Sequence, residues 1–339
     1  MKSMFRIAAL ASSCSLLTLA AAAQADQVKV NMDNYPAVET NRQMGVTLEA
    51  AGGINTFSHN RIVVPTDDQP VIRMNRDTLY SRAVVNASEG AHVTVPDAGD
   101  RYISLMYLDE DHRVYDMVYG PGTHGIPAYS DYMWVVVRIG VLSGDAADLA
   151  EINALQDKLE ISAVSDEPLV PIDYDPASLE QTHGQILEKF AASGILDTER
   201  MFGTADYTDP ELYLIGSAIG WGGATWKDNI YQFSKFFEGD ACRSTTFKDP
   251  KNVGGFWSVT VYDKEGFMFN DIANVNSNVA TPNDDGTFTV HFGCGEDAVN
   301  NIPVRNDTGA WQAAMRHYTP SDAVISGEIK PLPDIAEVK

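Results

Sequence analysis

The residues best suited to chemistry form a short polar segment in the first third of the chain. Its polar side chains are Arg73, Asn75, Arg76, Asp77 and Tyr80. Asn and Asp favour turns because their side chains bond to nearby backbone, so a turn into a strand explains part of the pattern. It does not explain two arginines around one aspartate in a chain with few bases. An Arg–Asp pair leaves other guanidinium N–H groups free for an anionic or hydroxylated ligand.

A second segment, residues 255–262, has the alternation of a strand. Ser258, Thr260 and Tyr262 share one face, and Trp257 lies on the other. Core packing is the favoured role for Trp257, and ligand contact is the alternative.

We predict a ligand cleft that combines these segments. Asp77 and at least one arginine would line it together with Tyr80 or Tyr107. The alternative is that Asp77 only caps its own turn and the arginines cover the surface. The predicted ligand-binding residues are Arg73, Asn75, Arg76, Asp77, Tyr80, Tyr107, Trp257 and Arg316.

No catalytic nucleophile is evident. The nearest string to the GxSxG elbow of serine hydrolases is GSAIG, in which the serine comes one place early. His-x-His and His-Glu-x-x-His are both absent, so no metal site is predicted. An esterase-like envelope hydrolase is the alternative to a binding protein. It would use His59 or His124 as general base, with Asp77 and Arg73 in support.

Two further motifs are interpreted as ordinary loops. Residues 120–125 match GxGxxG, but Pro127 follows and strands are predicted on both sides, so no helix meets a dinucleotide. No cofactor is therefore predicted. Residues 109–112 concentrate oxygen ligands but lack the pattern of a calcium loop, which favours a solvated turn.

The charge balance excludes several classes of partner. The 339 residues contain 24 Lys plus Arg and 47 Asp plus Glu, a formal net charge of −23. Nucleic acids and anionic membranes need clustered bases, so neither is an expected partner. A small-molecule ligand is expected instead, and the sequence leaves the oligomeric state open.

The N-terminal 25 residues have the pattern of a signal peptide. Lys2 and Arg6 precede an apolar stretch, and Ala23-Gln24-Ala25 fits the small-x-small cleavage rule. A membrane anchor and a lipoprotein signal at Cys14 are weaker alternatives. We therefore expect a periplasmic or secreted protein that starts at Asp26 and has no membrane anchor after cleavage.

Processing would leave Cys242 and Cys294. Two cysteines in an oxidising compartment suggest one disulfide, with two separate buried thiols as the alternative.

The chain has many short segments that are rich in β-branched and aromatic residues and are separated by turn signals. This pattern predicts a β-sandwich on each side of a helical stretch. The expected helices begin near residue 37, at Asp145, near Pro176 and at Asp209. The predicted fold class is mainly β with a helical connector (α+β). The predicted division is a signal peptide at 1–25, a β-sandwich at 26–143, a helical connector at 144–224 and a second β-sandwich at 225–339.

These segments also resemble a known pair of bacterial domains. Residues 73–81 are similar to the hallmark of the domain of unknown function numbered 1254. Residues 255–262, with the ending at 311–318, look like its usual companion, numbered 1214. The resemblance implies an immunoglobulin-like N-terminal sandwich, a helical linker and a jelly-roll-like C-terminal sandwich. It implies no settled reaction, although some relatives are labelled esterases. We therefore expect an exported protein that binds a small polar or anionic ligand between two sandwiches, and leave open whether it is an enzyme.

Overall fold

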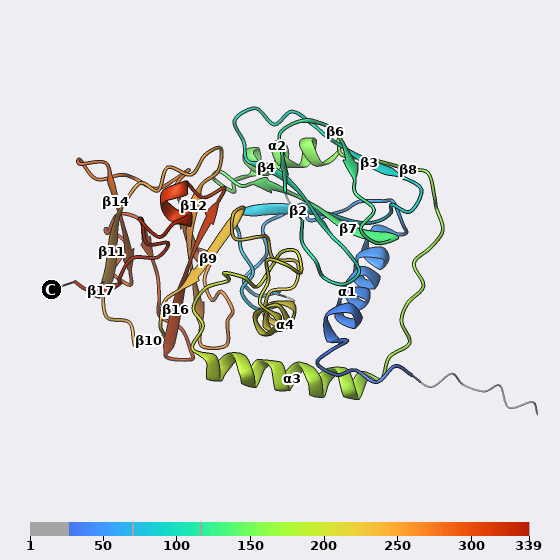
Figure 1. Cartoon of the computed structure of the whole chain (residues 1–339). Helices are drawn as coiled ribbons and strands as arrows, with labels where there is room; N and C mark the ends of the chain where they lie inside the picture. Colours follow the sequence, from blue (N-terminus) through green and yellow to red (C-terminus); the bar gives the residue numbers. More distant parts are fainter. Residues whose placement is uncertain (1–26, 70, 116, 339) are drawn as a thin grey trace, which may run out of the picture.

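The structure is a computed structural model that describes residues 27–69, 71–115 and 117–338. Strands account for 28% of the residues and helices for 19%, so the predicted mainly β, α+β fold class is confirmed. Figure 1 shows the C-terminal sandwich on the left and the N-terminal sandwich with most of the helices on the right. The predicted signal peptide lies outside the described residues.

The N-terminal sandwich packs a five-stranded sheet on a three-stranded one. In spatial order, the larger sheet contains β1 (Ser58–His59), β2 (Thr78–Asn86), β7 (Tyr132–Gly140), β4 (Ile103–Leu108) and β5 (Val118–Tyr119). The smaller sheet contains β6 (Gly122–Ile126), β3 (Ala91–Val95) and β8 (Glu160–Ala163). The core between them includes Leu79, Leu105 and Val135. Strand β8 belongs to this sandwich although it lies in the stretch expected to be helical.

Three helices cover the other face of the larger sheet. They are α1 (Tyr35–Ala51), α3 (Pro176–Ser193) and α4 (Pro210–Ile219), and they bury Val84, Met106 and Trp134. Helix α2 (Ala146–Gln156) adds Ile152 to the core between the sheets. The side chains of Asp145, Asp175 and Asp209 accept backbone N–H bonds at the starts of α2, α3 and α4, so these predicted starts are confirmed.

The C-terminal sandwich also has two sheets. One contains β10 (Phe237–Glu238), β16 (Ala310–Tyr318), β12 (Trp257–Asp263) and β13 (Asn274–Asn276), and β9 (Asn229–Phe233) also pairs with β16. The other contains β15 (Asn301–Ile302), β14 (Thr287–Phe292), β11 (Arg243–Lys248) and β17 (Ala336–Glu337). Trp257, Trp311 and Phe292 fill the core between them. A short helix, α5 (Asp322–Ile325), follows β16.

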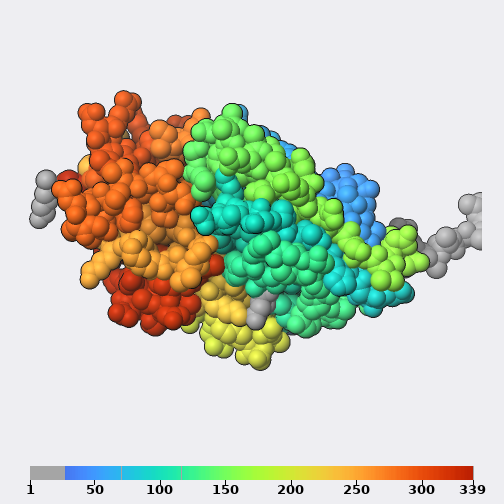
Figure 2. Space-filling view, turned by 90° about the horizontal axis from the view of Figure 1, so that it is seen from above, coloured from blue at the N-terminus to red at the C-terminus, as the bar shows by residue number. Residues whose placement is uncertain are grey.

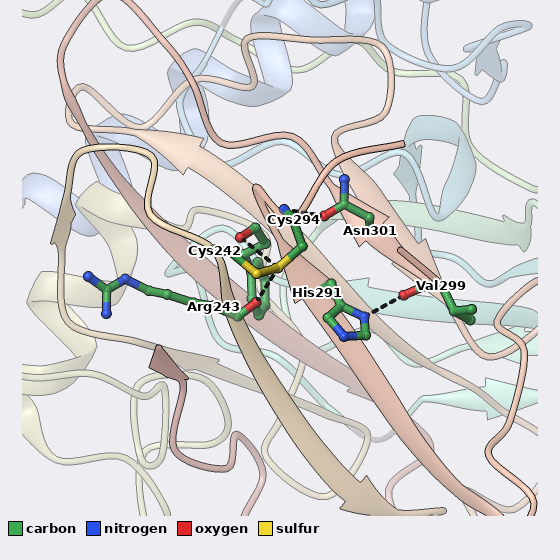
Figure 3. Close-up of a disulfide and its surroundings, with 7 residues drawn as sticks. Cys242, Arg243, His291, Cys294, Val299 and Asn301 are labelled. Carbon is green, nitrogen blue, oxygen red and sulfur yellow. Dashed lines mark hydrogen bonds between the residues drawn. A yellow bond between two sulfur atoms is a disulfide. The ribbon is translucent and has the colours of Figure 1, made fainter. Parts of the chain in front are cut away.

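The predicted disulfide between Cys242 and Cys294 is confirmed, with a Cα–Cα distance of 4.5 Å. It joins the start of β11 to the loop after β14, where the Cys294 N–H donates to the Asn301 side chain (Figure 3). Among the described residues no helix is long and apolar enough to cross a bilayer.

Candidate functional site

The two sandwiches meet through polar faces of their sheets. On the N-terminal sheet, Arg138 of β7 lies between Tyr80 of β2 and Ser104 of β4 in the strand register. On the C-terminal sheet, Arg316 of β16 lies between Ser258 of β12 and Tyr231 of β9. Figure 1 shows β9 beside β2 at the junction, and Figure 2 shows the two halves packed directly together. We call Asp77, Tyr80, Arg138, Tyr231 and Arg316 the inter-sandwich site.

Asp77 connects the two sandwiches through its carboxylate. Oδ1 accepts from Ser258 Oγ (2.7 Å) and Asn274 Nδ2 (2.8 Å), and Oδ2 accepts from the Tyr318 hydroxyl (3.2 Å). Asp77 is fully buried, and burial raises the pKa of its carboxyl group, although the charge of Arg316 opposes the rise. It therefore does more than cap its own turn.

Arg316 is buried and is also held by neutral groups. Its guanidinium donates to Thr260 Oγ1 (3.0 Å), to the Tyr262 hydroxyl (2.6 Å) and to the backbone carbonyl of Arg73 (3.0 Å). It forms no ion pair with any residue that the structure describes. Arg316 therefore fixes the segment before Asp77, and the negative charge of Asp77 acts on it without a direct ion pair.

Arg73 brings a further positive charge to this junction. Its guanidinium lies near the rings of Phe190 (5.3 Å) and Phe233 (4.8 Å), and its φ is +58°. Burial and the charge of Arg316 lower its pKa. Arg76 instead lies at the edge of the junction, where its Nη1 is 3.6 Å from Oδ1 of the exposed Asp271.

Asn75 orients the Tyr80 hydroxyl. Asn75 Oδ1 accepts from the backbone N–H groups of Asp77 (3.0 Å) and Thr78 (3.2 Å), which leaves Nδ2 to donate to the Tyr80 oxygen (2.9 Å). The Arg138 guanidinium lies 5.3 Å from the centre of the Tyr80 ring. Burial opposes ionisation of Tyr80, but the charge of Arg138 and the bond from Asn75 outweigh it and lower the pKa of this phenol.

Arg138 is the residue of this site that the sequence analysis missed. It is 3% exposed, donates to the Gly222 carbonyl (2.9 Å) and the Met106 sulfur (3.5 Å), and also interacts with Tyr80. Gly222 has a φ of +73°, which suits glycine. Arg138 follows the apolar run from Met133 to Val137, and an arginine in a strand expected to be buried on both faces was the available signal.

Several buried polar atoms beside Arg138 have no hydrogen-bond partner in the described part of the chain. They are Arg138 Nε and Asn229 Oδ1, whereas the Tyr102 hydroxyl and Ser104 Oγ, which also lack a bond of good geometry, lie close enough to interact with each other. Tyr102 lies close enough to Arg138 and Tyr231 to interact with them electrostatically. Buried polar atoms are nearly always paired, so such a group marks a place where a bound molecule or water completes the bonding.

Two predicted site residues lie elsewhere. Tyr107 lies opposite Val135 on the far face of the N-terminal sheet and packs in the core between its two sheets. Trp257 is 1% exposed in the core of the C-terminal sandwich, which is the favoured interpretation of the sequence. Both are separated from the inter-sandwich site by the strands that carry them.

The catalytic candidates do not assemble with Asp77. His59 Nδ1 lies 2.8 Å from Ser81 Oγ, but Ser81 is fully buried on the face that packs in the core. Burial, followed by the charge of Arg61, lowers the pKa of His59. His124 lies on the smaller sheet, and its Nε2 is 3.4 Å from the Gly120 carbonyl oxygen. Neither histidine makes a contact with Asp77 or Arg73.

In the acidic turn at residues 109–112, the carboxylate oxygens of Asp109 accept hydrogen bonds from neighbouring residues of the chain. Asp109 accepts from the backbone N–H groups of Asp111 and Arg113 and from the Tyr115 hydroxyl. No group of three or more possible metal ligands occurs within the described ranges.

Two surface pockets lie away from the inter-sandwich site. One, of about 390 Å³, lies between α3 and α4, and the other, of about 640 Å³, lies beside the loop before β14. Neither is lined by a predicted ligand-binding residue.

The fold and site define a protein of two β-sandwiches with a polar, buried junction. Two family models match it, both described as proteins of unknown function: DUF1254 over residues 54–163 and DUF1214 over residues 237–322. The chain therefore belongs to the proteins that join these two domains in this order, as the resemblance implied.

Solved structures show the same fold. The VPA0106 protein from Vibrio parahaemolyticus has a TM-score of 0.66 at 20% identity, covering 91% of this chain and 98% of its own. An uncharacterised protein from Burkholderia cenocepacia has a TM-score of 0.52 at 14% identity, covering 90% and 88%. No protein with a curated description matches the chain.

Proposed function

We propose that this protein binds a small anionic molecule at the inter-sandwich site and that Arg138 is its anchor. The observation that carries the proposal is the environment of Arg138. Arg138 is 3% exposed, its guanidinium forms no ion pair with a carboxylate in the described ranges, and its Nε has no hydrogen-bond partner there. Arginine offers paired N–H groups that match carboxylates and phosphates.

The charges around the site support an anionic ligand. Three arginines, Arg73, Arg138 and Arg316, lie at this junction with two buried carboxylates. Asp77 acts on Arg316, and Asp228 accepts from the Tyr119 hydroxyl (2.9 Å) close to Tyr102. An excess of buried positive charge is costly unless it is compensated. The whole chain carries a net charge of −23, so the local excess is opposite in sign to the protein. A bound anion would offset it.

Part of the site is buried and part is half-buried, as at Tyr80 and Tyr231. Arg316 is 4% exposed and Asp77 is fully buried. A ligand that contacts Arg316 or Asp77 must therefore be small.

Thermal unfolding in acetate, succinate or phosphate, at constant ionic strength, tests this proposal. We expect at least one anion to stabilise the protein, by about 2.7 kcal/mol at a hundred times its Kd. Arg138→Met should abolish the response. Arg61→Met is the control, because Arg61 is a partly exposed arginine paired with the exposed Asp157 (2.6 Å), so its loss should cost little stability and keep the response.

Two results would contradict the proposal. A response that survives Arg138→Met would place the anion elsewhere. No response in the unchanged protein would mean that the polar cluster only joins the sandwiches.

We also propose that the protein is exported to the periplasm or secreted. The disulfide supports this, because such bonds persist in oxidising compartments, and residues 1–25 have the pattern of a signal peptide. N-terminal sequencing from the native host should begin at Asp26. Recovery of chains that begin at Met1 from the cytosol would contradict export.

The esterase-like alternative has one observation in its favour, the short contact between His59 and Ser81. Against it, Ser81 is fully buried. An ester-hydrolysis assay of Ser81→Ala and His59→Gln tests the alternative, and activity lost in both variants while their fold persists would support it.

A further inference from the structure

His112 is a buried histidine with two unfavourable features that core packing does not explain. It is 1% exposed and lies among the rings of Phe202, Tyr213 and Trp221, at centroid distances of 5.8–6.1 Å. Its φ of +63° lies in the region that favours glycine, and its Nδ1 has no hydrogen-bond partner in the described part of the chain. An apolar side chain would fill this space without a buried polar atom, so the imidazole contributes more than volume.

That contribution is a hydrogen bond from the backbone of Gly222. His112 Nε2 accepts the Gly222 N–H at 3.1 Å. Nε2 is therefore unprotonated, and the proton of the neutral ring lies on the unpartnered Nδ1. Burial, followed by the charge of Arg113, lowers the pKa of His112 to about 3, so the ring keeps this acceptor at neutral pH.

Gly222 connects His112 to Arg138. Its N–H donates to the imidazole, and its carbonyl accepts from Arg138 Nη2 at 2.9 Å. A Cβ at this position would lie 3.4 Å from the ring of Trp134, so the backbone passes close to the indole. Glycine has the freest backbone of all residues, and the bond to His112 therefore helps to fix the direction of the Gly222 carbonyl.

The direction of that carbonyl matters for the guanidinium of Arg138. Nη2 donates to Gly222, Nη1 donates to the Met106 sulfur, and Tyr80 also interacts with the group. A thioether is a weak acceptor, so the carbonyl is the stronger of the two acceptors bound by the Nη atoms. Nε has no hydrogen-bond partner among the residues that the structure describes. Because a guanidinium is planar, the group that orients Nη2 also orients Nε.

We propose that His112 is a positioning residue of the anion site. It holds the backbone of Gly222, keeps its carbonyl toward Arg138 and so directs the unpartnered Nε–H of Arg138 toward the bound anion. This inference rests on the proposed function. It adds a residue that sets the affinity for anions by acting through Gly222, without touching the anion.

Calorimetric titration tests this role with whichever of acetate, succinate and phosphate stabilises the unchanged protein. His112→Phe fits among the surrounding rings but removes the acceptor. We expect its Kd to rise about tenfold, which is about 1.4 kcal/mol and matches the loss of one hydrogen bond. His112→Gln keeps an acceptor for the Gly222 N–H and should bind with a Kd within about twofold of the original.

His317→Phe is the matched control. His317 is also a fully buried histidine, but its Nε2 lies 2.7 Å from the Pro331 carbonyl oxygen, in the C-terminal sandwich. Its loss should lower stability and leave the Kd unchanged. A Kd that stays unchanged in His112→Phe, or that rises equally in His112→Gln or His317→Phe, would overturn the positioning role alone. An unchanged protein that binds none of the three anions would overturn the proposed function itself.

NMR of the unchanged protein keeps the test decisive if His112→Phe does not fold. The resonances to follow are the Gly222 amide, the His112 ring nitrogens and the Arg138 Nε–H, which is assigned by its absence in Arg138→Met. Addition of the anion should shift all three with one Kd, because the bonds between them are continuous. A shift of the Arg138 resonance while those of Gly222 and His112 stay in place would overturn the positioning role.

Discussion

The N-terminal sandwich buries arginines at two places and surrounds them differently. The Arg101 guanidinium pairs with Asp148 (2.6 Å) and Glu151 (2.8 Å), and its side chain is 7% exposed. Arg138, which is 3% exposed as a whole residue, instead donates to one carbonyl and one sulfur atom. The first arrangement ties α2 to the end of β7. The second leaves a buried charge uncompensated by any described residue.

This difference separates a structural from a functional arginine. A buried pair is stable as a unit, and loss of one member leaves the other charge buried. An unpaired buried charge destabilises the fold by itself, so its presence suggests a role in binding. The predictions below are made for protein without added ligand.

The largest effect is expected for Arg101→Met. The substitution leaves the Asp148 carboxylate buried without its cation, and we expect the free energy of unfolding to fall by about 3–5 kcal/mol. Urea unfolding measures it. A change below about 1 kcal/mol would show that the pair of Arg101 and Asp148 does not stabilise the fold.

Two buried histidines avoid the cost of a buried charge because they stay neutral. Burial lowers the pKa of His112 to about 3 and that of His317 to about 4. Because these folded-state pKa values lie below the unfolded value of about 6.5, stability is full above that pH and is lost as the pH falls toward them. At pH 5 we expect a loss of about 2 kcal/mol for each histidine.

Urea unfolding at pH 7 and at pH 5, which lie on either side of the unfolded histidine pKa of about 6.5, measures this loss. His112→Gln keeps an acceptor for the Gly222 N–H, which His112 Nε2 accepts at 3.1 Å. It should flatten the pH dependence even if it lowers stability overall. An unchanged slope would show that His112 is not the group that titrates.

Arg138→Met should have a smaller effect of about 1 kcal/mol or less. It leaves the Gly222 carbonyl without its donor, which costs about 1 kcal/mol, but it also removes a buried charge. The same urea experiment compares the loss in the free energy of unfolding of Arg138→Met with that of Arg101→Met. If both substitutions destabilise equally, Arg138 is structural and the comparison fails.

The smallest effect is expected for Asp77→Asn. An asparagine oxygen can keep the bonds from Ser258 and Asn274, and the Tyr318 hydroxyl can turn to accept from the new amide. Because burial raises the pKa of Asp77, its charge weakens the fold at neutral pH, and we expect a change below about 1 kcal/mol. Asp148→Asn, which breaks the pair with Arg101, is the contrasting variant and should cost more.

Much of the fold follows from local patterns. Asp145, Asp175 and Asp209 begin helices because each cap supplies an acceptor to the first free N–H groups. The cysteine pair follows from an even count after processing, and its bond is present. Strand β8 was missed because Glu160–Ala163, although it alternates between polar and apolar residues, is only four residues long and lies between two helical patterns.

The candidate site was predicted in part. Asp77, Tyr80 and Arg316 do lie at one junction, and Asp77 contacts the strands that carry Ser258 and Tyr318. Arg138 was missed because a single arginine after an apolar run does not indicate which side of the strand it occupies.

Sequence alternation by itself determined which residues of one strand share a face: Trp257 opposes Ser258, and Leu79 opposes Tyr80. Only the tertiary structure decided which faces meet. Tyr80 joins Arg138 and Tyr107 does not, because the register of β2, β7 and β4 places Tyr80 and Arg138 toward the C-terminal sandwich and Tyr107 toward the core. That register depends on pairings between strands distant in the chain, which alternation within one strand cannot specify.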